Sequence, residues 1–434
     1  MTTLLPSLIV LAYVGTACAA NDEPPPQEID PHEAVEEHHQ EGDVGHAWHE
    51  GDTLTGDWGG GREWLVDHGF TFEMLYTADF FYNLRGGLNT SDAEQYRGLL
   101  ALGFTLDTCQ AGLWDNGTFF VSAIQNHGTD ITARHLGDLQ AANNNDAPND
   151  TRLYEFWYGH DFFDGRLTVK LGKLDANNDF AAPEFGGEFI HSSPGFSPTI
   201  PMPTWPDPAL GVEVFIKPSD WIYFGAGVFD AQGVGTRSGF ETALHSPDDS
   251  FTIAEVGVRP KLSLFGQQDL PGTYRVGGFY HSGEWDVYFN DLDGRLPART
   301  HRGNAGVYAV FDQLLYREHH EVEDDEQGLG AFFQFGWADS DYNEITQHYG
   351  GGLQYVGLLP GRDCDVCGLG VHHVSLSGKA QSMEKRYGET AIEAFYKCQV
   401  TEFFSLKPDV QYIANPGGDG RDAIVAGVRM EIVF

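Results

Sequence analysis

The last thirteen residues of the chain, 422–434, alternate apolar and polar side chains. Every second residue from Ile424 to Phe434 is apolar, whereas the interleaved positions include Arg429 and Glu431. A period of two residues is typical of a β-strand with one apolar and one polar face. A strand of a soluble β-sandwich has the same pattern, so the interpretation depends on whether the rest of the chain repeats it.

The alternation recurs in short segments separated by turn residues. In residues 70–81, Phe70, Phe72 and Met74 lie on one face and Glu73 on the other. The chain also contains 54 Gly and 48 Phe plus Tyr, which suits an all-β protein with many turns. The sixteen predicted strands are residues 70–81, 97–106, 117–126, 151–159, 166–172, 210–217, 221–229, 251–258, 272–281, 303–312, 328–337, 345–356, 368–376, 389–400, 403–413 and 422–434.

These strands are expected to cross a membrane. Beyond the N-terminal leader the chain has no run of ~18 apolar residues, the length that a spanning helix needs. A closed β-barrel can span a bilayer instead, because it pairs every backbone polar group. The sequence therefore predicts an all-β fold, a transmembrane antiparallel β-barrel of about 16 strands formed by residues 70–434.

The connections support this count because they alternate between long and short. If the first strand starts in the periplasm, the long ones all lie outside the cell and the last strand returns Phe434 to the periplasm. The acidic connection 313–327 is the one long segment on the inner side. The long outer connections are residues 81–96, 127–150, 173–209, 230–250 and 282–302.

Three segments precede the barrel. Residues 1–20 are uncharged and end near Ala17-Cys18-Ala19, which indicates a secretory signal peptide without a basic start; lipidation of Cys18 is the alternative. Residues 21–53 form an acidic, His-rich tail with a triple proline, which we interpret as a flexible segment or, alternatively, as a collector of Zn or Cu. Residues 54–69 form a periplasmic lead-in.

Charge narrows the range of partners. The 64 acidic and 25 basic residues give a formal net charge of -39. Such a chain repels the phosphates of nucleic acids, so we expect no nucleic-acid partner. Aromatic residues at predicted strand ends, such as Phe80, Phe81 and Phe162, are expected in a girdle at the membrane interface.

Six short motifs occur along the chain: LTGDWGG at 54–60 followed by Arg62, NGTF at 116–119, QNHG at 125–128, LGKLDAN at 171–177, LKPDVQYI at 406–413 and NPGG at 415–418. Together they resemble the motifs of a known family, the OprB-type carbohydrate-selective outer-membrane porins. The resemblance extends from about residue 54 to residue 434, and the acidic tail and the cysteines depart from it. It implies a sixteen-stranded barrel in the outer membrane that passes sugars down their gradient.

A pore selective for sugars needs charged groups and amides for the hydroxyls, and flat aromatic faces for the C–H side of the ring. By similarity to porins generally, we expect the long loop 173–209 to fold inward and narrow the lumen. Each single residue has the alternative role of a solvated wall charge. The predicted pore-lining residues are Glu73, Asp79, Glu155, Lys170, Lys173, Asp175, Asn177, Asp179, Trp205, Glu213, Arg429 and Glu431.

The cysteines lead to a separate prediction. Cys364 and Cys367 are followed by His372 and His373, a spacing that suggests a metal site. Adjacent residues of a strand point in opposite directions, however, so the two histidines cannot both face one ion. In the oxidising periplasm we expect instead a disulfide between Cys364 and Cys367, or a pairing with another thiol, and we predict no cofactor.

The most favoured function is passive, carbohydrate-selective diffusion of mono- or short oligosaccharides. The alternatives are a general or cation-preferring porin and a non-channel structural barrel. An enzyme is not expected, because the chain lacks a G-x-S-x-G elbow; Ser192-Ser193 beside His191 is the nearest candidate. The expected partners are sugars, outer-membrane lipid and lipopolysaccharide, the assembly machinery acting through the Phe434 strand, and further copies in an oligomer.

Overall fold

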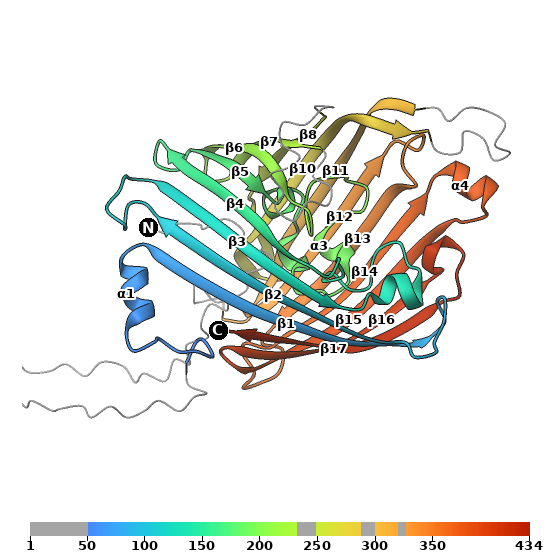
Figure 1. Cartoon of the computed structure of the whole chain (residues 1–434), viewed down its shortest axis with the longest axis horizontal. Helices are drawn as coiled ribbons and strands as arrows, with labels where there is room; N and C mark the ends of the chain where they lie inside the picture. Colours follow the sequence, from blue (N-terminus) through green and yellow to red (C-terminus); the bar gives the residue numbers. More distant parts are fainter. Residues whose placement is uncertain (1–50, 232–248, 288–299, 320–326) are drawn as a thin grey trace, which may run out of the picture.

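The structure is a computed structural model that describes residues 51–231, 249–287, 300–319 and 327–434 (Figure 1). The predicted signal peptide and most of the predicted tail lie outside the described residues. The helices are α1 (Gly61–Asp67), α2 (Ala176–Asp179), α3 (Ser192–Gly195) and α4 (Gly378–Met383). None of them is both long and apolar enough to cross a membrane.

The strands form one closed antiparallel barrel (Figure 1). β1 pairs with β2 on one side and with β17 on the other, which closes a ring of 16 strands. The strands are β1 (Phe70–Arg85), β2 (Glu94–Asp107), β3 (Gly117–Gly128), β4 (Thr151–Phe162), β5 (Leu167–Leu174), β6 (Ala209–Ser219), β7 (Ile222–Asp230), β8 (Ser250–Val258), β9 (Lys261–Leu264), β10 (Gln267–Asp286), β11 (Thr300–Arg317), β12 (Gly328–Ala338), β13 (Ile345–Val356), β14 (Val366–Leu376), β15 (Gly388–Thr401), β16 (Phe404–Ala414) and β17 (Ala423–Val433).

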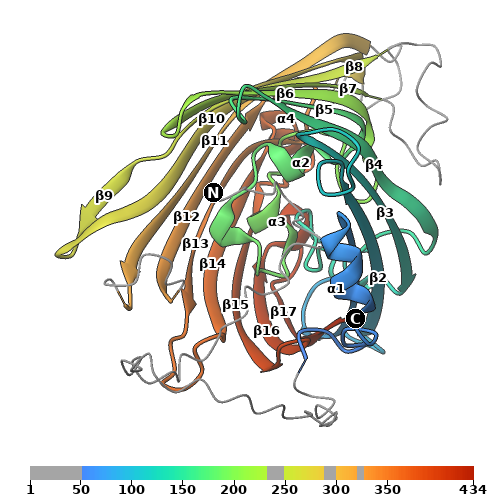
Figure 2. The ribbon, with the colours of Figure 1, turned by 90° about the vertical axis from the view of Figure 1, so that its left-hand side faces the viewer.

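The predicted fold is confirmed. Each of the sixteen predicted segments overlaps one strand of the ring, from β1 to β8 and from β10 to β17. The additional strand β9 was not predicted, because it has only four residues. It pairs with the start of β10 in a hairpin outside the ring, which projects beyond the barrel in Figure 2.

Along each strand, successive side chains point alternately into the lumen and toward the outer wall, as the sequence pattern requires. In β1, Asp79 and Phe81 are buried on the inner face, whereas Phe80 and Tyr82 are exposed on the outer face. The interpretation of Phe81 as a girdle residue was therefore wrong. Its side chain packs against Ile190 and other apolar residues inside the barrel.

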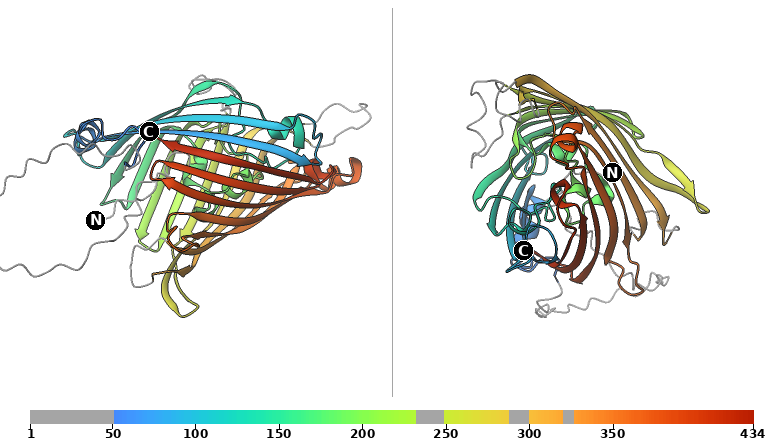
Figure 3. Two further views of the ribbon diagram at one scale, coloured as in Figure 1. Left: turned by 90° about the horizontal axis from the view of Figure 1, so that it is seen from below. Right: turned by 90° about the vertical axis from the view of Figure 1, so that its right-hand side faces the viewer.

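The lead-in segment meets the end of the chain at the seam between β1 and β17. α1 and the C-terminus lie at the same end of the barrel (Figure 3). The N–H of Leu54 donates to the carbonyl of Val433 at 2.8 Å, and Arg62 Nη2 donates to the carbonyl of Phe434 at 2.9 Å. The lead-in thus adds contacts at the end of β17.

Two outer connections turn into the barrel. We call residues 129–150, between β3 and β4, loop L2, and residues 175–208, between β5 and β6, loop L3. Figure 2 shows α2 and α3, both part of L3, inside the ring of strands. An apolar cluster forms where Phe180 and Met202 of L3 meet Phe215, Phe251 and Tyr308 of the wall. The space between L3 and the wall at β6, β8 and β11 is therefore a packed apolar core.

The predicted disulfide between Cys364 and Cys367 is wrong, because Cys367 is a free thiol. Cys367 pairs with Tyr355 and Tyr396 on the neighbouring strands. A disulfide needs Cα atoms within about 7 Å. Cys364 precedes β14 and is itself disulfide-bonded, whereas Cys367 lies in the extended backbone of β14 and stays free, so the open alternative, a pairing of Cys364 with another thiol, agrees with the structure.

Candidate functional site

L3 is held across the lumen by carboxylates of the wall. Strands β8, β11 and β15 each supply a buried carboxylate that accepts backbone N–H groups of the loop. Since each loop N–H would otherwise lose its partner inside the barrel, these bonds fix the course of L3. The pairs are Ala181 N to Glu255 Oε2 (3.1 Å), Phe185 N to Asp312 Oδ1 (3.1 Å), Ile190 N to Glu393 Oε1 (2.6 Å) and His191 N to Glu393 Oε2 (3.1 Å).

Glycines of the wall leave room for the side chains of L3. A Cβ added at Gly370 would lie 2.7 Å from the ring of Phe189, closer than real Cβ contacts. A Cβ at Gly336 would lie 2.1 Å from the hydroxyl of Thr199. Side chains of L3 also meet the wall glycines Gly225, Gly227, Gly330, Gly352 and Gly368.

L2 is fixed to the wall in the same way. Glu389 of β15 accepts the N–H of Leu139 at 2.8 Å and that of Gln140 at 3.1 Å. Gln411 Nε2 of β16 donates to the carbonyl of Ala142 at 2.8 Å. The two loops therefore approach the same wall, and the N–H of Asn144 donates to the carbonyl of Ile190 at 2.8 Å.

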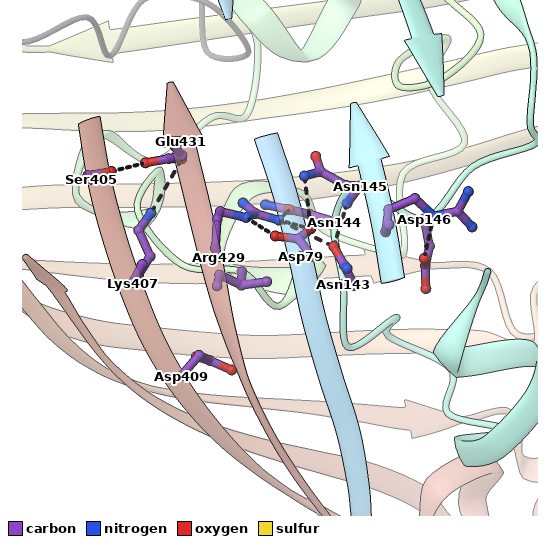
Figure 4. Close-up of polar contacts among 12 residues, drawn as sticks. Asp79, Asn143, Asn144, Asn145, Asp146, Ser405, Lys407, Asp409, Arg429 and Glu431 are labelled. Carbon is purple, nitrogen blue, oxygen red and sulfur yellow. Dashed lines mark hydrogen bonds and ion pairs between the residues drawn. The ribbon is translucent and has the colours of Figure 1, made fainter. Parts of the chain in front are cut away.

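A row of charged residues follows β16, β17 and β1, next to L2 (Figure 4). Lys397 of β15 extends the row through its contact with Glu431. Arg429 Nε and Nη2 donate to the two oxygens of Asp79 at 2.7 and 2.9 Å. Asn145 Nδ2 donates to Asp79 at 3.0 Å, and Arg429 Nη2 donates to Asn144 at 2.7 Å. The ion pair of the wall is thus completed by side-chain amides of L2.

Glu188 of L3 lies between two lysines of the wall. Its carboxylate is 2.8 Å from Lys397 Nζ and also pairs with Lys407. Burial acts to raise the pKa of Glu188, but the two ammonium groups outweigh burial and lower it below its ordinary value. Glu431 lies 3.5 and 3.9 Å from the same lysines. Both ammonium charges therefore face carboxylates.

L2 contributes a further pair near this row. Arg97 Nε of β2 lies 3.1 Å from Asp146 Oδ1, and Arg97 Nη1 donates to Asn149 at 2.8 Å. Burial, together with the neighbouring Asp130, raises the pKa of Asp146 to about 8 in spite of Arg97. The protonation of this carboxyl is therefore sensitive to pH in the neutral to alkaline range.

A second charged group surrounds Lys170 on β4, β5 and β6. Lys170 Nζ pairs with Asp179 of L3 at 2.7 Å and is the register partner of Glu213. Glu155 accepts the N–H of Asp175 at 3.2 Å. The carboxylate oxygens of Glu213 are buried and accept no hydrogen bond from a described residue.

The remaining predicted residues near this group are Trp205, Lys173 and Asn177. The ring of Trp205 packs against Tyr154, with 5.6 Å between the ring centroids, and its buried Nε1 lacks a partner among the described residues. Lys173 donates to the carbonyl of Leu153. Asn177 Nδ2 donates to the carbonyl of Phe180 at 3.2 Å and so stabilises the first turn of L3.

The structure thus brings most predicted site residues together in two groups. Asp79, Arg429 and Glu431 belong to the charged row, and the residues around Lys170 form the second group. Glu73 lies on the inner face of β1 opposite Gly103, in neither group. That any of these residues contacts a sugar remains a prediction.

Sequence reasoning missed several residues that hold the loops. Glu389, Glu393 and Lys397 follow one another at a spacing of four in β15, so the alternation already placed them on one inner face. Their partners in L2 and L3 could not be found, because contacts between a loop and a distant strand leave no periodic signal. Among the described residues, no group of His, Cys, Asp and Glu is arranged to hold a metal ion.

Comparisons with known proteins agree with this architecture. The family model described as "Carbohydrate-selective porin, OprB family" matches residues 92–434. Porin B of Pseudomonas aeruginosa is 25% identical over 421 residues, which cover 88% of this chain and 91% of that protein.

Two solved structures of Pseudomonas putida OprB resemble the structure of this chain to different degrees. The high-pH structure has a TM-score of 0.79 at 25% identity and covers 89% of this chain and 100% of the other. The low-pH structure has a TM-score of 0.58 at 21% identity, with 89% and 99% covered. The match of the family model to most of the chain, on a closed barrel with an inward loop, shows that the chain belongs to the OprB family of carbohydrate-selective porins, outer-membrane proteins that let sugars diffuse passively.

Proposed function

We propose that this chain passes mono- and short oligosaccharides through a constriction that L3 and L2 form together. The observation that carries the proposal is the fixed inward course of L3, whose N–H groups are bonded to Glu255, Asp312 and Glu393. A loop held at three strands of the wall narrows the lumen to a constant width. Constant width and fixed polar groups are what selective passage of a small polar solute requires.

The polar groups around this constriction suit sugars. A sugar hydroxyl both donates and accepts, so a wall of alternating carboxylates, ammonium groups and amides can exchange hydrogen bonds with it along the path. Trp205, which is partly exposed, offers an aromatic face in the same region, and the buried ring of Tyr154 packs against it. We propose the twelve predicted residues as the lining, with Trp205 and Asn177 as the first contacts to test, because both are partly exposed.

No covalent chemistry is part of the proposal. Ser193 Oγ donates to Gln140 Oε1 at 2.9 Å, and His191 Nδ1 accepts the N–H of Ser193 at 3.3 Å. The serine hydroxyl is therefore not directed at a base as a nucleophile would be. This supports a channel without enzymatic activity.

A general, cation-preferring pore is the second candidate, and the net charge of -39 favours it. The test is single-channel conductance of the refolded protein in a planar bilayer, with a titration of glucose and of maltose. A current that decreases with sugar and saturates supports a sugar site in the lumen. If neither sugar alters the current while the salt-gradient reversal potential shows strong cation preference, the general pore is right.

Trp205→Ala gives the matching test of the site. It should weaken the sugar block at least several-fold, because one aromatic face is lost. Trp64→Ala is the control, since Trp64 lies on α1 outside the lumen and is 57% exposed. If sugar blocks the current through both variants as strongly as through the unaltered protein, Trp205 does not contact the sugar.

The other proposed partners follow from the outer surface. The exposed aromatic residues Phe80, Tyr82 and Phe162 suit contacts with lipid and lipopolysaccharide at the interface. We also propose that the outer-membrane assembly machinery binds the strand that ends at Phe434. Assembly into oligomers is testable by mass measurement in detergent.

A further inference from the structure

The buried basic side chains of this barrel are almost all neutralised. Seven buried Lys and Arg residues are present among the described residues, and all except Lys173 form an ion pair with a carboxylate. Lys173 donates to a backbone carbonyl instead. The seven residues are Arg97, Arg152, Lys170, Lys173, Lys397, Lys407 and Arg429.

Buried carboxylates outnumber these bases. Twelve Asp and Glu residues are buried among the described residues, against the seven bases. They are Asp79, Asp138, Glu155, Asp175, Glu188, Glu213, Glu255, Asp312, Asp365, Glu389, Glu393 and Asp409. Two of the twelve pair with bases outside this set, Asp312 with Arg275 and Asp365 with Arg362. In formal charge the remaining ten still exceed the seven bases, and the field of that formal surplus acts on any ion that enters.

The bases of the charged row, part of which Figure 4 shows, are the clearest example of neutralised basic groups. The three bases, Lys397, Lys407 and Arg429, would attract an anion if they stood alone. Glu188 and Asp79 are already paired with them, however. An entering carboxylate or phosphate would have to displace one of these partners and leave a buried charge uncompensated, which is costly.

One carboxylate oxygen beside the row lacks a donor. Asp409 Oδ2 is buried and accepts no hydrogen bond from a described residue. Asp409 lies beside the row in Figure 4, and its other oxygen accepts from Gln411 Nε2 at 3.0 Å. Acceptors without donors suit a solute that brings its own donors, either hydroxyls or an ammonium group.

We infer that the pore selects sugars by charge: neutral sugars and cationic amino sugars pass, whereas uronic acids and sugar phosphates are excluded. This inference rests on the proposed function, because it assigns the substrate class of the same constriction. The paired bases offer an anion no vacant partner, and the surplus carboxylates repel it. An amino sugar carries a positive charge, so the same field attracts it.

The test uses proteoliposomes of the full chain and measures swelling with four solutes of similar ring size. Glucosamine is the cation, glucose and N-acetylglucosamine are the neutral solutes, and glucuronate is the anion. We expect glucosamine to enter at least as fast as glucose, and glucuronate to enter about tenfold more slowly or not at all. Raising the ionic strength should reduce these differences, because salt screens the field.

Variants link the selectivity to the paired bases. Glu188→Gln removes the carboxylate shared by Lys397 and Lys407, and Asp79→Asn removes that of Arg429. Each should raise the ratio of the glucuronate rate to the glucose rate several-fold. Asp341→Asn is the control, because Asp341 pairs with Lys379 outside the barrel strands and should leave the ratio unchanged.

The possible outcomes distinguish a failure of this inference from a failure of the proposed function. If the unaltered protein admits glucuronate as fast as glucose, or glucosamine more than twofold slower than glucose, the inference is overturned and the sugar pore stands. If glucose and N-acetylglucosamine both fail to enter, the proposed function itself fails. The four-solute comparison needs no variant, so the inference can be tested even if Glu188→Gln does not fold.

Discussion

At the scale of single residues, wall glycines determine whether L3 can lie inside the barrel. Gly370 faces the ring of Phe189, and Gly187, within L3 itself, has open space around it. We expect Gly370→Ala to push Phe189 off the wall and to cost about 1–3 kcal/mol of stability through overpacking. Conductance should rise and sugar block weaken, because the constriction is displaced.

The control for this change is Gly187→Ala, which adds the same methyl group to the loop without a clash. Thermal unfolding and single-channel recordings of both variants provide the measurement. Equal behaviour of the two variants would show that the contact between Gly370 and Phe189 does not set the width of the pore.

Asp146 makes the ion preference depend on pH. Burial raises its pKa to about 8, so the carboxyl is neutral below that pH and negative above it. As pH rises from 6 to 9, one negative charge appears beside Arg97, and the reversal potential in a salt gradient should shift toward stronger cation preference. Asp146→Asn should remove that part of the shift. A shift of the same size in the variant would assign the titration to another group.

At the scale of elements, L3 depends on β15 through Glu393, which accepts two N–H groups of the loop. Glu393→Gln should cost about 1–3 kcal/mol, since the amide can accept only one of them and leaves the other N–H buried without a partner. We expect larger fluctuations of the open current and faster proteolysis within residues 190–199. The control is Glu344→Gln, outside the strands, where Glu344 pairs with Arg386.

The alternation of side chains was sufficient to predict every strand of the ring, because each strand has one face in lipid and one in the lumen. It failed at β9, whose four residues are too few to show a period. The two inward loops mark the other limit. L3 was expected to fold inward only by similarity, and the contacts of Glu393 with Ile190 and His191 join positions about two hundred residues apart.

The candidate site was predictable in part for the same reason. Polar residues on inner faces, such as Asp79 and Arg429, appear in the sequence at the polar positions of the alternation. Their pairing follows from the register between β1 and β17, which is fixed only when the barrel closes. The isolated position of Glu73 and the free thiol of Cys367 likewise depend on where the folded strands lie.

At the scale of the whole molecule, the barrel closes where β1 meets β17, and the pair Asp79–Arg429 lies across that seam. Both side chains are buried, so removing one partner leaves an uncompensated charge in the interior. We expect Asp79→Asn to cost about 3–5 kcal/mol, as is typical when a buried pair is broken on one side. Unfolding in urea, followed by gel mobility and near-UV circular dichroism, provides the measurement.

The double variant Asp79→Asn with Arg429→Gln tests the origin of that cost. Two neutral amides can bond to one another and to Asn145, so we expect the double variant to be more stable than Asp79→Asn alone, with a coupling of about 0.5–3 kcal/mol. Strictly additive losses would mean that the pair contributes nothing to closure. In that case the backbone ladder and the contact between Arg62 and the end of the chain would hold the seam without it.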